Sequence, residues 1–356
     1  MPGTTSLTIN NEDLSLTLFD QVKELRAMKD HPYLLADDAL ANVDKVDGGE
    51  RVIVRWDVDD HSVPTRVRTG YESFSTFAQP TLQPGHQAWG IVVQPVFISS
   101  VDEQKNNGRA QILKVLEERV KNVERHMHRQ FQQVLLRGAA AGGTWVGVPG
   151  WDDWLSINGA DTALGLVEDQ ASGTNTLHGV SKASYPAATH EQFHNYFGDA
   201  AADASANLLP LMYAAGVDAQ IKEGDPNPSE SFWYLSRSAA NNLKTILRVQ
   251  EQYISDGSMD DGKRVAHMMY GGIKARPTAE MPNTGTASTA DPWSALRVNW
   301  KRGIRLRMMG GWVFDWTDFM DLPGTVGVRY SLCKVWGQPI CLQPGLQALI
   351  IDAEAL

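Results

Sequence analysis

Apolar side chains recur at intervals of three and four residues along residues 109–137, and this spacing is typical of an amphipathic helix. Gly138 follows directly, in the position where glycine commonly ends a helix. At 1.5 Å per residue the helix would be about 40 Å long, so we expect it to form the spine of a domain. The residues predicted to pack its apolar face are Ile112, Leu116, Val120, Val123, Met127 and Phe131.

A stretch of alternating apolar and polar residues precedes this helix. Residues 51–59 carry Val or Trp at every second position, which predicts a half-buried strand. We expect a second strand over residues 89–98, where Pro95 favours a position at a sheet edge. The connection between them is far longer than a hairpin turn, and connections of that length are usually functional. We therefore predict an extended β-hairpin loop over residues 51–100, whose aromatic side chains another subunit would cover: Tyr71, Phe74, Phe77 and Trp89.

The rest of the chain mixes both kinds of pattern. Residues 138–160 are rich in glycine and tryptophan and predict a loop held by aromatic anchors. Helical spacing follows near residues 190–215 and 236–255, and strands are predicted near 265–276 and 294–308. This mixture places the chain in the α+β class.

Composition and charge exclude several classes of protein. The 356 residues include 32 Lys and Arg against 42 Asp and Glu, and the net charge of −10 argues against wrapping nucleic acid through bulk positive charge. The sequence has no run of about 18 apolar residues and no signal-peptide pattern at its start, so we expect no membrane span and folding in the cytoplasm. Cys333 and Cys341 predict two buried, reduced thiols rather than a disulfide framework.

One motif invites a catalytic interpretation. His190, Glu191 and His194 match H-E-x-x-H, a pattern in which two histidines on one helix face bind zinc and the glutamate acts as a base. Thr189 and Gln192, however, form a capping box that would put His190 in the first turn of a helix. We therefore expect the match to mark a helix start. Because no other group of residues supports catalysis, we predict no catalytic residue, no cofactor and no metal.

The order of the predicted elements resembles the major capsid protein of tailed double-stranded DNA bacteriophages, which has the Hong Kong 97-type fold. Residues 101–120 look like the start of the spine helix in such proteins, and the segment Leu177–Lys182 is similar to a glycine-hydrophobic-Ser-basic run that many of them carry. Here His178 stands where that run often has a second glycine, and His194 stands where Trp or Arg is frequent.

The resemblance implies an α+β fold of five parts. They are an N-terminal arm (1–50), the extended β-hairpin loop (51–100), a peripheral domain with the spine helix at 109–137 (101–184), an axial α/β domain (185–300) and returning strands that complete both domains (301–356).

The resemblance also implies a structural virion protein. Such a protein assembles into hexamers and pentamers of an icosahedral head, which encloses double-stranded DNA without sequence-specific binding. Because the arm begins close to Met1, we expect a separate scaffolding protein, with portal and decoration proteins as further partners. The expected location is the virion, after assembly in the host cytoplasm.

Two other functions stay open at this point. The shell protein of an encapsulin-type nanocompartment has the same fold, and the sequence does not separate it from a phage head. The more distant alternative is a zinc hydrolase that uses His190, Glu191 and His194.

Overall fold

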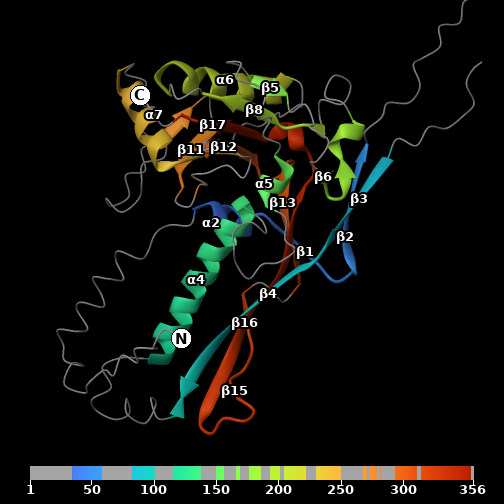
Figure 1. The fold of residues 1–356 in the computed structure, drawn as a ribbon, viewed down its shortest axis with the longest axis vertical. Helices are drawn as coiled ribbons and strands as arrows, with labels where there is room; N and C mark the ends of the chain where they lie inside the picture. Colours follow the sequence, from blue (N-terminus) through green and yellow to red (C-terminus); the bar gives the residue numbers. More distant parts are fainter. Residues whose placement is uncertain are drawn as a thin grey trace, which may run out of the picture.

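The structure is a computed structural model, and it confirms the α+β class (Figure 1). The predicted loop aromatics Tyr71, Phe74 and Phe77 lie outside the residues that it describes, as do Ile112, His190 and Glu191. The described residues are 34–57, 82–100, 115–137, 150–155, 166–168, 176–185, 193–200, 204–221, 230–249, 268–270, 273–278, 281, 293–310 and 314–353.

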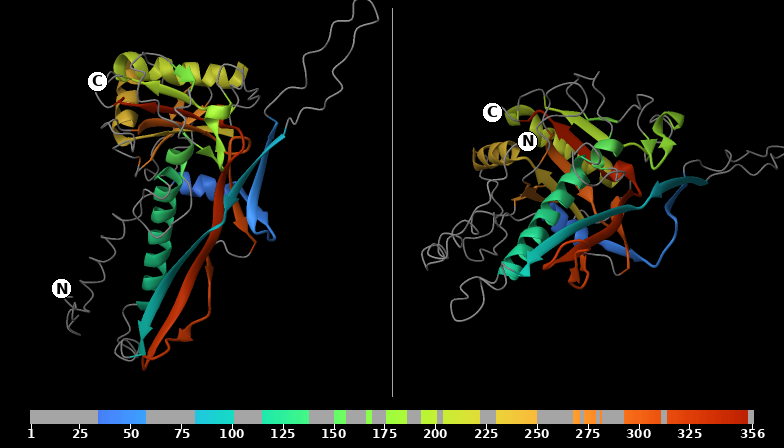
Figure 2. Two further views of the ribbon diagram at one scale, coloured as in Figure 1. Left: turned by 45° about the vertical axis from the view of Figure 1, so that its right-hand side comes forward. Right: turned by 60° about the horizontal axis from the view of Figure 1, so that its bottom comes forward.

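A seven-stranded mixed sheet forms one end of the molecule, with strand order β10-β11-β9-β12-β17-β8-β5 (Figures 1 and 2). The pairs β11–β9 and β17–β8 are parallel, and the other neighbours are antiparallel. The strands are β5 (Leu166–Glu168), β8 (Tyr196–Asp199), β9 (Ser231–Leu235), β10 (Met268–Tyr270), β11 (Ile273–Pro277), β12 (Trp293–Asn299) and β17 (Ala348–Ile351).

Helices cover both faces of this sheet. α6 (Ala204–Ile221) and α7 (Arg237–Val249) pack on one face, around alternate residues of the strands. The opposite face shares a core with α2 (Leu34–Ala41), α4 (Val115–Arg137) and α5 (Trp151–Trp154). All seven residues of β12 are buried, as a strand covered on both faces requires.

A second sheet of six strands is long and narrow and runs beside α4 (Figure 1). Its central strand, β16, is 14 residues long and pairs with β4 over the length of that strand. The strands are β1 (Val43–Val46), β4 (Gly90–Ser99), β13 (Ile304–Met309), β14 (Asp315–Trp316), β15 (Met320–Asp321) and β16 (Val328–Cys341).

Two smaller ribbons and two short turns complete the described part. β2 (Arg51–Asp57) pairs with β3 (Leu82–Ala88), and β6 (Thr176–Leu177) pairs with β7 (Val180–Ser181). The 3₁₀ turns are η2 (Lys182–Ser184) and η5 (Pro344–Leu346).

The predicted spine helix is present over Val115–Arg137, and its expected first residues, 109–114, lie outside the described part. Met127 and Phe131 of the predicted stripe are buried. Val120 and Val123 are half-buried, and the side chain of Leu116 is not among those described. The predicted alternation of β2 is also confirmed, because Val52, Val54 and Trp56 are buried.

The strand predicted at residues 89–98 is confirmed as β4 (Gly90–Ser99), but its pairing differs from the prediction. The partner of β2 is residues 82–88, whereas residues 90–99 form β4 and pair with β16, a longer partner. Residues 196–199 form a strand where a helix was expected from residue 190, because a short apolar run buried in a sheet lacks a distinguishing period. Residues 34–46, at the end of the expected arm, pack into the body through α2 and β1.

Candidate assembly surfaces

The β2–β3 ribbon belongs to the predicted hairpin loop, and the end of the ribbon that contains Trp56 is fixed to other parts of the same chain. We call this end the loop root. Trp56 Nε1 donates a hydrogen bond of 2.8 Å to the carbonyl oxygen of Leu342. The Trp56 ring stacks on His178 at 5.8 Å and meets Phe193 edge-on at 5.4 Å. Opposite it, Gly85 leaves room for the ring, because a Cβ atom there would lie 2.4 Å from a ring carbon of Trp56. The direction of the ribbon is therefore set by tight packing.

His178 joins this root to two other elements. It lies in the β6–β7 turn with φ +48°, and its Nε2 accepts a hydrogen bond of 2.9 Å from the backbone N–H of Cys341. Its Nδ1 is 3.4 Å from Oε1 of Gln87, and its ring lies 5.0 Å from that of Trp154. Burial lowers the pKa of His178 to about 4, so the ring is neutral at pH 7.

Lys182 belongs to the segment that carried the family resemblance, and its buried side chain connects several elements of the fold. Lys182 is fully buried, and its Nζ donates hydrogen bonds to the Trp154 carbonyl oxygen at 2.6 Å and to Asn195 Oδ1 at 3.0 Å. This side chain therefore ties α5 and η2 to the segment just before β8.

The zinc motif is not supported by the residues that are described. His194 is buried just before strand β8 and not on a helix, so it lacks the helical face that H-E-x-x-H requires. Its Nε2 contacts the carbonyl oxygen of Tyr185. Among the described residues no cluster of His, Cys, Asp or Glu could hold a metal ion.

Both cysteines are buried free thiols, as the sequence predicted. Burial raises the pKa of Cys333 to about 11 and that of Cys341 to about 12. Both therefore stay protonated at neutral pH and act as small apolar side chains.

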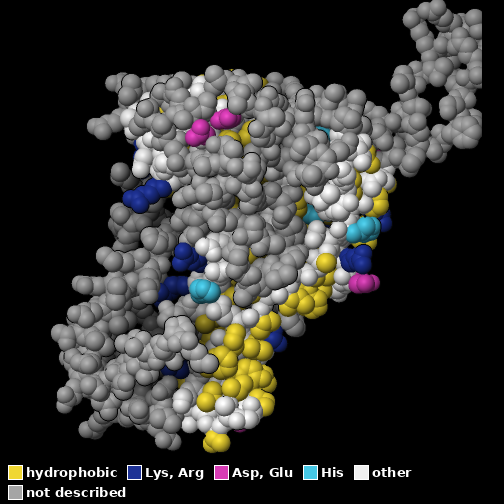
Figure 3. Space-filling view, in the orientation of Figure 1, with side chains coloured by type: hydrophobic (Ala, Val, Ile, Leu, Met, Phe, Trp, Pro, Cys, Tyr) yellow, Lys and Arg dark blue, Asp and Glu magenta, His cyan; other side chains and the backbone are white. Residues whose placement is uncertain are grey.

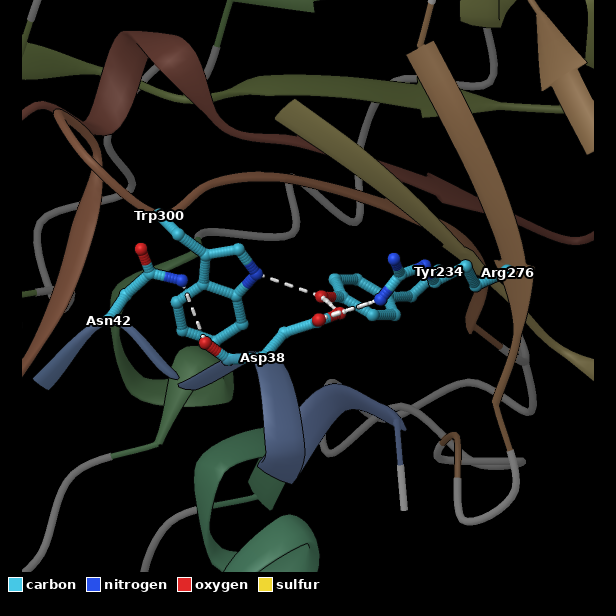
Figure 4. Close-up of polar contacts among 5 residues, drawn as sticks. All are labelled: Asp38, Asn42, Tyr234, Arg276 and Trp300. Atoms are coloured by element: carbon cyan, nitrogen blue, oxygen red, sulfur yellow. Dashed lines mark hydrogen bonds and ion pairs between the residues drawn. The ribbon is translucent and has the colours of Figure 1, made fainter. Parts of the chain in front are cut away.

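An ion pair anchors α2 to the seven-stranded sheet (Figure 4). Both carboxylate oxygens of Asp38 lie 2.6 Å from Nη1 of Arg276, and Tyr234 donates its hydroxyl proton to Oδ2 at 2.6 Å. Trp300 Nε1 donates to the Tyr234 hydroxyl at 2.8 Å. Burial and the charge of Asp38 raise the pKa of Tyr234 well above its usual value, so it remains a donor. Sequence patterns did not single out any of these residues.

Trp89 is half-buried against its own chain, and its coverage by another subunit stays a prediction. Its Nε1 donates a hydrogen bond of 2.8 Å to the carbonyl oxygen of Gly49, and its ring meets that of Trp336 edge-on at 6.4 Å.

The two faces of the β4–β16 ribbon differ sharply. Val92, Val96 and Ile98 are buried on the side where α4 packs. Arg119 of α4 donates from Nη1 to the Phe97 carbonyl oxygen at 2.8 Å, which fixes the helix to the ribbon.

The other face of this ribbon, together with β15, leaves large apolar side chains exposed. Ile91, Val93 and Phe97 are between 43% and 52% exposed, and Met320 is 43% exposed. Phe97 and Met320 both oppose Tyr330 across the sheet, and Ile91 opposes Trp336. We call these six residues the ribbon face. Figure 3 shows hydrophobic side chains gathered over this end of the sheet. Contiguous exposed apolar surface of this kind marks interaction sites.

Comparison with known proteins identifies the class of fold. No protein-family model matches the chain, and no curated protein matches its sequence. Among solved structures, the cyanophage A-1(L) capsid asymmetric unit is similar over 87% of this chain and 90% of the other, with a TM-score of 0.58 and 12% identity. The capsid of the native GTA particle matches over 88% and 89%, with a TM-score of 0.53 and 13% identity.

A shell protein outside the phages is also similar. The holo-SrpI encapsulin complex from Synechococcus elongatus PCC 7942 matches over 91% of this chain and 88% of the other, with a TM-score of 0.50 and 10% identity. The chain therefore has the Hong Kong 97-type fold of phage capsid proteins, as the resemblance in sequence implied. In the described part no helix is long and apolar enough to cross a membrane.

Proposed function

We propose that this protein is the subunit of an icosahedral phage head, in which hexamers and pentamers of the chain enclose double-stranded DNA. The observation that carries the proposal is the ribbon face, a contiguous apolar surface in a chain with the capsid fold. Permanent subunit interfaces are large and apolar at their centre, and exposed Ile, Val and Phe side chains on a rigid sheet supply such a centre.

The proposed role is structural and not enzymatic. Three polar side chains of the described part join elements: Asp38 links α2 to the sheet, His178 links the loop root to β16, and Lys182 links α5 to the segment before β8. The proposed partners are other copies of the chain, a separate scaffolding protein, a portal and decoration proteins, and the proposed location is the virion.

Electron microscopy of the purified full-length chain tests the proposal. We expect closed shells of uniform size in negative stain and a sedimentation coefficient far above that of a monomer. A variant in which a short Gly-Ser linker replaces residues 58–81 retains β2 and β3, and should fold without closing into shells. A wild-type chain that stays monomeric at high concentration would overturn the proposal.

A nanocompartment shell is the second candidate, because the fold also matches an encapsulin complex. The contents of shells purified from native source cells separate the two functions. Nuclease-protected double-stranded DNA supports the phage head, and a stoichiometric enzyme in place of DNA supports the nanocompartment.

A further inference from the structure

One edge of the long sheet ends in a strand that pairs with no further described strand. β16 has β13, β14 and β15 on one side and β4 on the other, and Figures 1 and 2 show β4 running alongside it. β4 is 10 residues long and carries no charged side chain. Natural proteins usually protect an edge strand with charges, bulges or prolines, because its unpaired backbone groups can pair with another chain. Of these devices β4 has a proline, Pro95.

The hydrogen-bond pattern shows which backbone groups of β4 point away from β16. The N–H of Ser100 donates a hydrogen bond of 2.7 Å to the carbonyl oxygen of Gly327, in the register of the β4–β16 ladder. Such groups alternate along an antiparallel strand, so the even-numbered residues of β4 bond to β16 and the odd-numbered residues point outward. The contact of Arg119 with the Phe97 carbonyl oxygen agrees with this assignment. So does Pro95, because a proline at an outward position removes no hydrogen bond from the ladder.

The outward backbone groups of Ile91 and Val93 are open to another chain. Within the described part, neither residue has a hydrogen bond on this side. The spine helix contacts the strand farther along, at Phe97 and at Gln94, whose Oε1 lies 3.1 Å from Nδ1 of His126. Ile91 and Val93 are 52% and 43% exposed. The backbone and the side chain of the same two residues can therefore meet a partner.

A second copy of the same strand satisfies these groups. If two antiparallel copies are related by a two-fold axis that passes beside Val92, Ile91 of each copy lies opposite Val93 of the other. Each of these pairs exchanges two backbone hydrogen bonds, which gives four bonds in all. A register with Ile91 opposite Pro95 would instead place the proline ring against a carbonyl oxygen. The sequence of the strand therefore favours the register centred on Val92.

The side chains of two such strands also match. Because β4 carries no charge, two identical edges do not repel each other. Ile91 and Val93 both belong to the ribbon face, so these side chains from the two copies would lie side by side as cross-strand pairs. The same surface would be used by both copies, as a closed two-fold contact requires.

We propose that two copies of the chain join along their β4 strands about a two-fold axis, so that two six-stranded sheets become one continuous sheet. The inference deepens the proposed function and rests on it, because it names one contact through which subunits of the shell are joined. The apolar ribbon faces of the two copies then form a single surface across the contact.

Cysteine cross-linking tests the register of this contact. Opposite residues of a hydrogen-bonded antiparallel pair have Cα atoms about 5.5 Å apart, which suits a disulfide. Full-length Ile91→Cys and Val93→Cys chains are mixed, assembled and oxidised with copper phenanthroline, and the products are analysed by non-reducing electrophoresis and peptide mass spectrometry. We expect a disulfide between positions 91 and 93 of different chains in the mixture. The native Cys333 and Cys341 are buried.

A matched control uses another exposed position of the same strand. Phe97 is 47% exposed on the same face, but in the proposed register it lies beyond Pro95 and away from Val93 of the second copy. A mixture of Phe97→Cys and Val93→Cys should therefore give less cross-linked dimer by about tenfold or more, as should either single variant of the first pair alone. Equal cross-linking in all mixtures would overturn the inference.

A proline substitution tests the backbone bonds separately. Val93→Pro removes an N–H that points away from β16, so the chain should keep the circular dichroism spectrum of the wild type but lose assembly. Val93→Thr keeps this N–H and a similar shape, and it should assemble. Assembly of Val93→Pro at wild-type yield would overturn the inference.

Electron microscopy keeps the two proposals apart. Normal wild-type shells without the disulfide between positions 91 and 93 defeat only the β4 contact. The disulfide in oxidised dimers of a chain that forms no shells supports the β4 contact and defeats the proposed function.

Discussion

Gly85 and Trp56 form the tightest contact at the root of the hairpin loop, where a single methyl group would not fit. A Cβ atom on residue 85 would lie 2.4 and 2.5 Å from two ring atoms of Trp56, and the Trp56 ring is held by His178 and Phe193. We expect Gly85→Ala to lower the free energy of unfolding by about 1–3 kcal/mol, the usual cost of overpacking. Chemical denaturation measures this change.

A second substitution checks the cause. Trp56→Leu removes the ring that the new methyl group would hit, so Gly85→Ala should cost less than about 0.5 kcal/mol in that background. The coupling in this double-mutant cycle is the predicted quantity. Additive effects of the two substitutions would show that the contact does not determine the fit of the ribbon.

His178 makes the stability of the loop root depend on pH. Its pKa is about 4 in the folded chain, below the usual 6.5, so the unfolded chain binds more protons between these values. The stabilisation is therefore complete above pH 6.5 and is lost as the pH falls towards 4, by about 3 kcal/mol in all. Protonation of Nε2 would also replace the acceptor of the Cys341 hydrogen bond with an N–H group that faces the backbone N–H of Cys341.

The variant His178→Asn removes the titrating group and tolerates the positive φ at this position. Urea denaturation at pH 7 and pH 4 should show that the wild type loses about 3 kcal/mol more than the variant between the two values. Identical pH dependence in the two chains would contradict the assignment of this effect to His178.

At the scale of elements, α2 connects the spine helix to the seven-stranded sheet. Leu35, Ala36 and Ala39 are buried in the core that includes Met127 of α4, while Asp38 binds Arg276 and Tyr234 of the sheet. Asp38→Ala would leave both sheet residues without this partner, and we expect it to lower the free energy of unfolding by about 2–4 kcal/mol.

The neighbouring Asp37 supplies a matched control for this substitution. It belongs to the same turn of α2 and is exposed, so Asp37→Ala should change stability by less than about 0.5 kcal/mol. Thermal denaturation of both variants at pH 7 gives the comparison. Equal effects of the two would show that the loss comes from helix charge and not from the anchor.

Elements with a clear local period could be predicted from the sequence. The stripe of α4 and the alternation of β2 depend on neighbouring residues alone, and both are present. The pairing of β4 with β16 joins residues more than 200 positions apart, and no local pattern encodes it. The Asp38–Arg276 contact spans 238 positions and was missed for the same reason. His178 could be noted from the sequence only as a departure from a family pattern, because its structural role depends on contacts with β2, β3, β16 and α5.

At the scale of the whole molecule, the ribbon face should decide whether subunits assemble. The triple substitution Ile91→Thr/Val93→Thr/Phe97→Thr replaces exposed side chains with a residue that favours strands, so the monomer should keep its stability within about 1 kcal/mol. A shell interface would lose its apolar centre, and we expect shells to be absent in negative stain and the chain to sediment as a monomer or single capsomer.

The conservative variant Ile91→Val/Val93→Ile/Phe97→Leu keeps an apolar face and should form shells. Shells from the threonine variant at wild-type yield would show that the ribbon face is not an assembly interface.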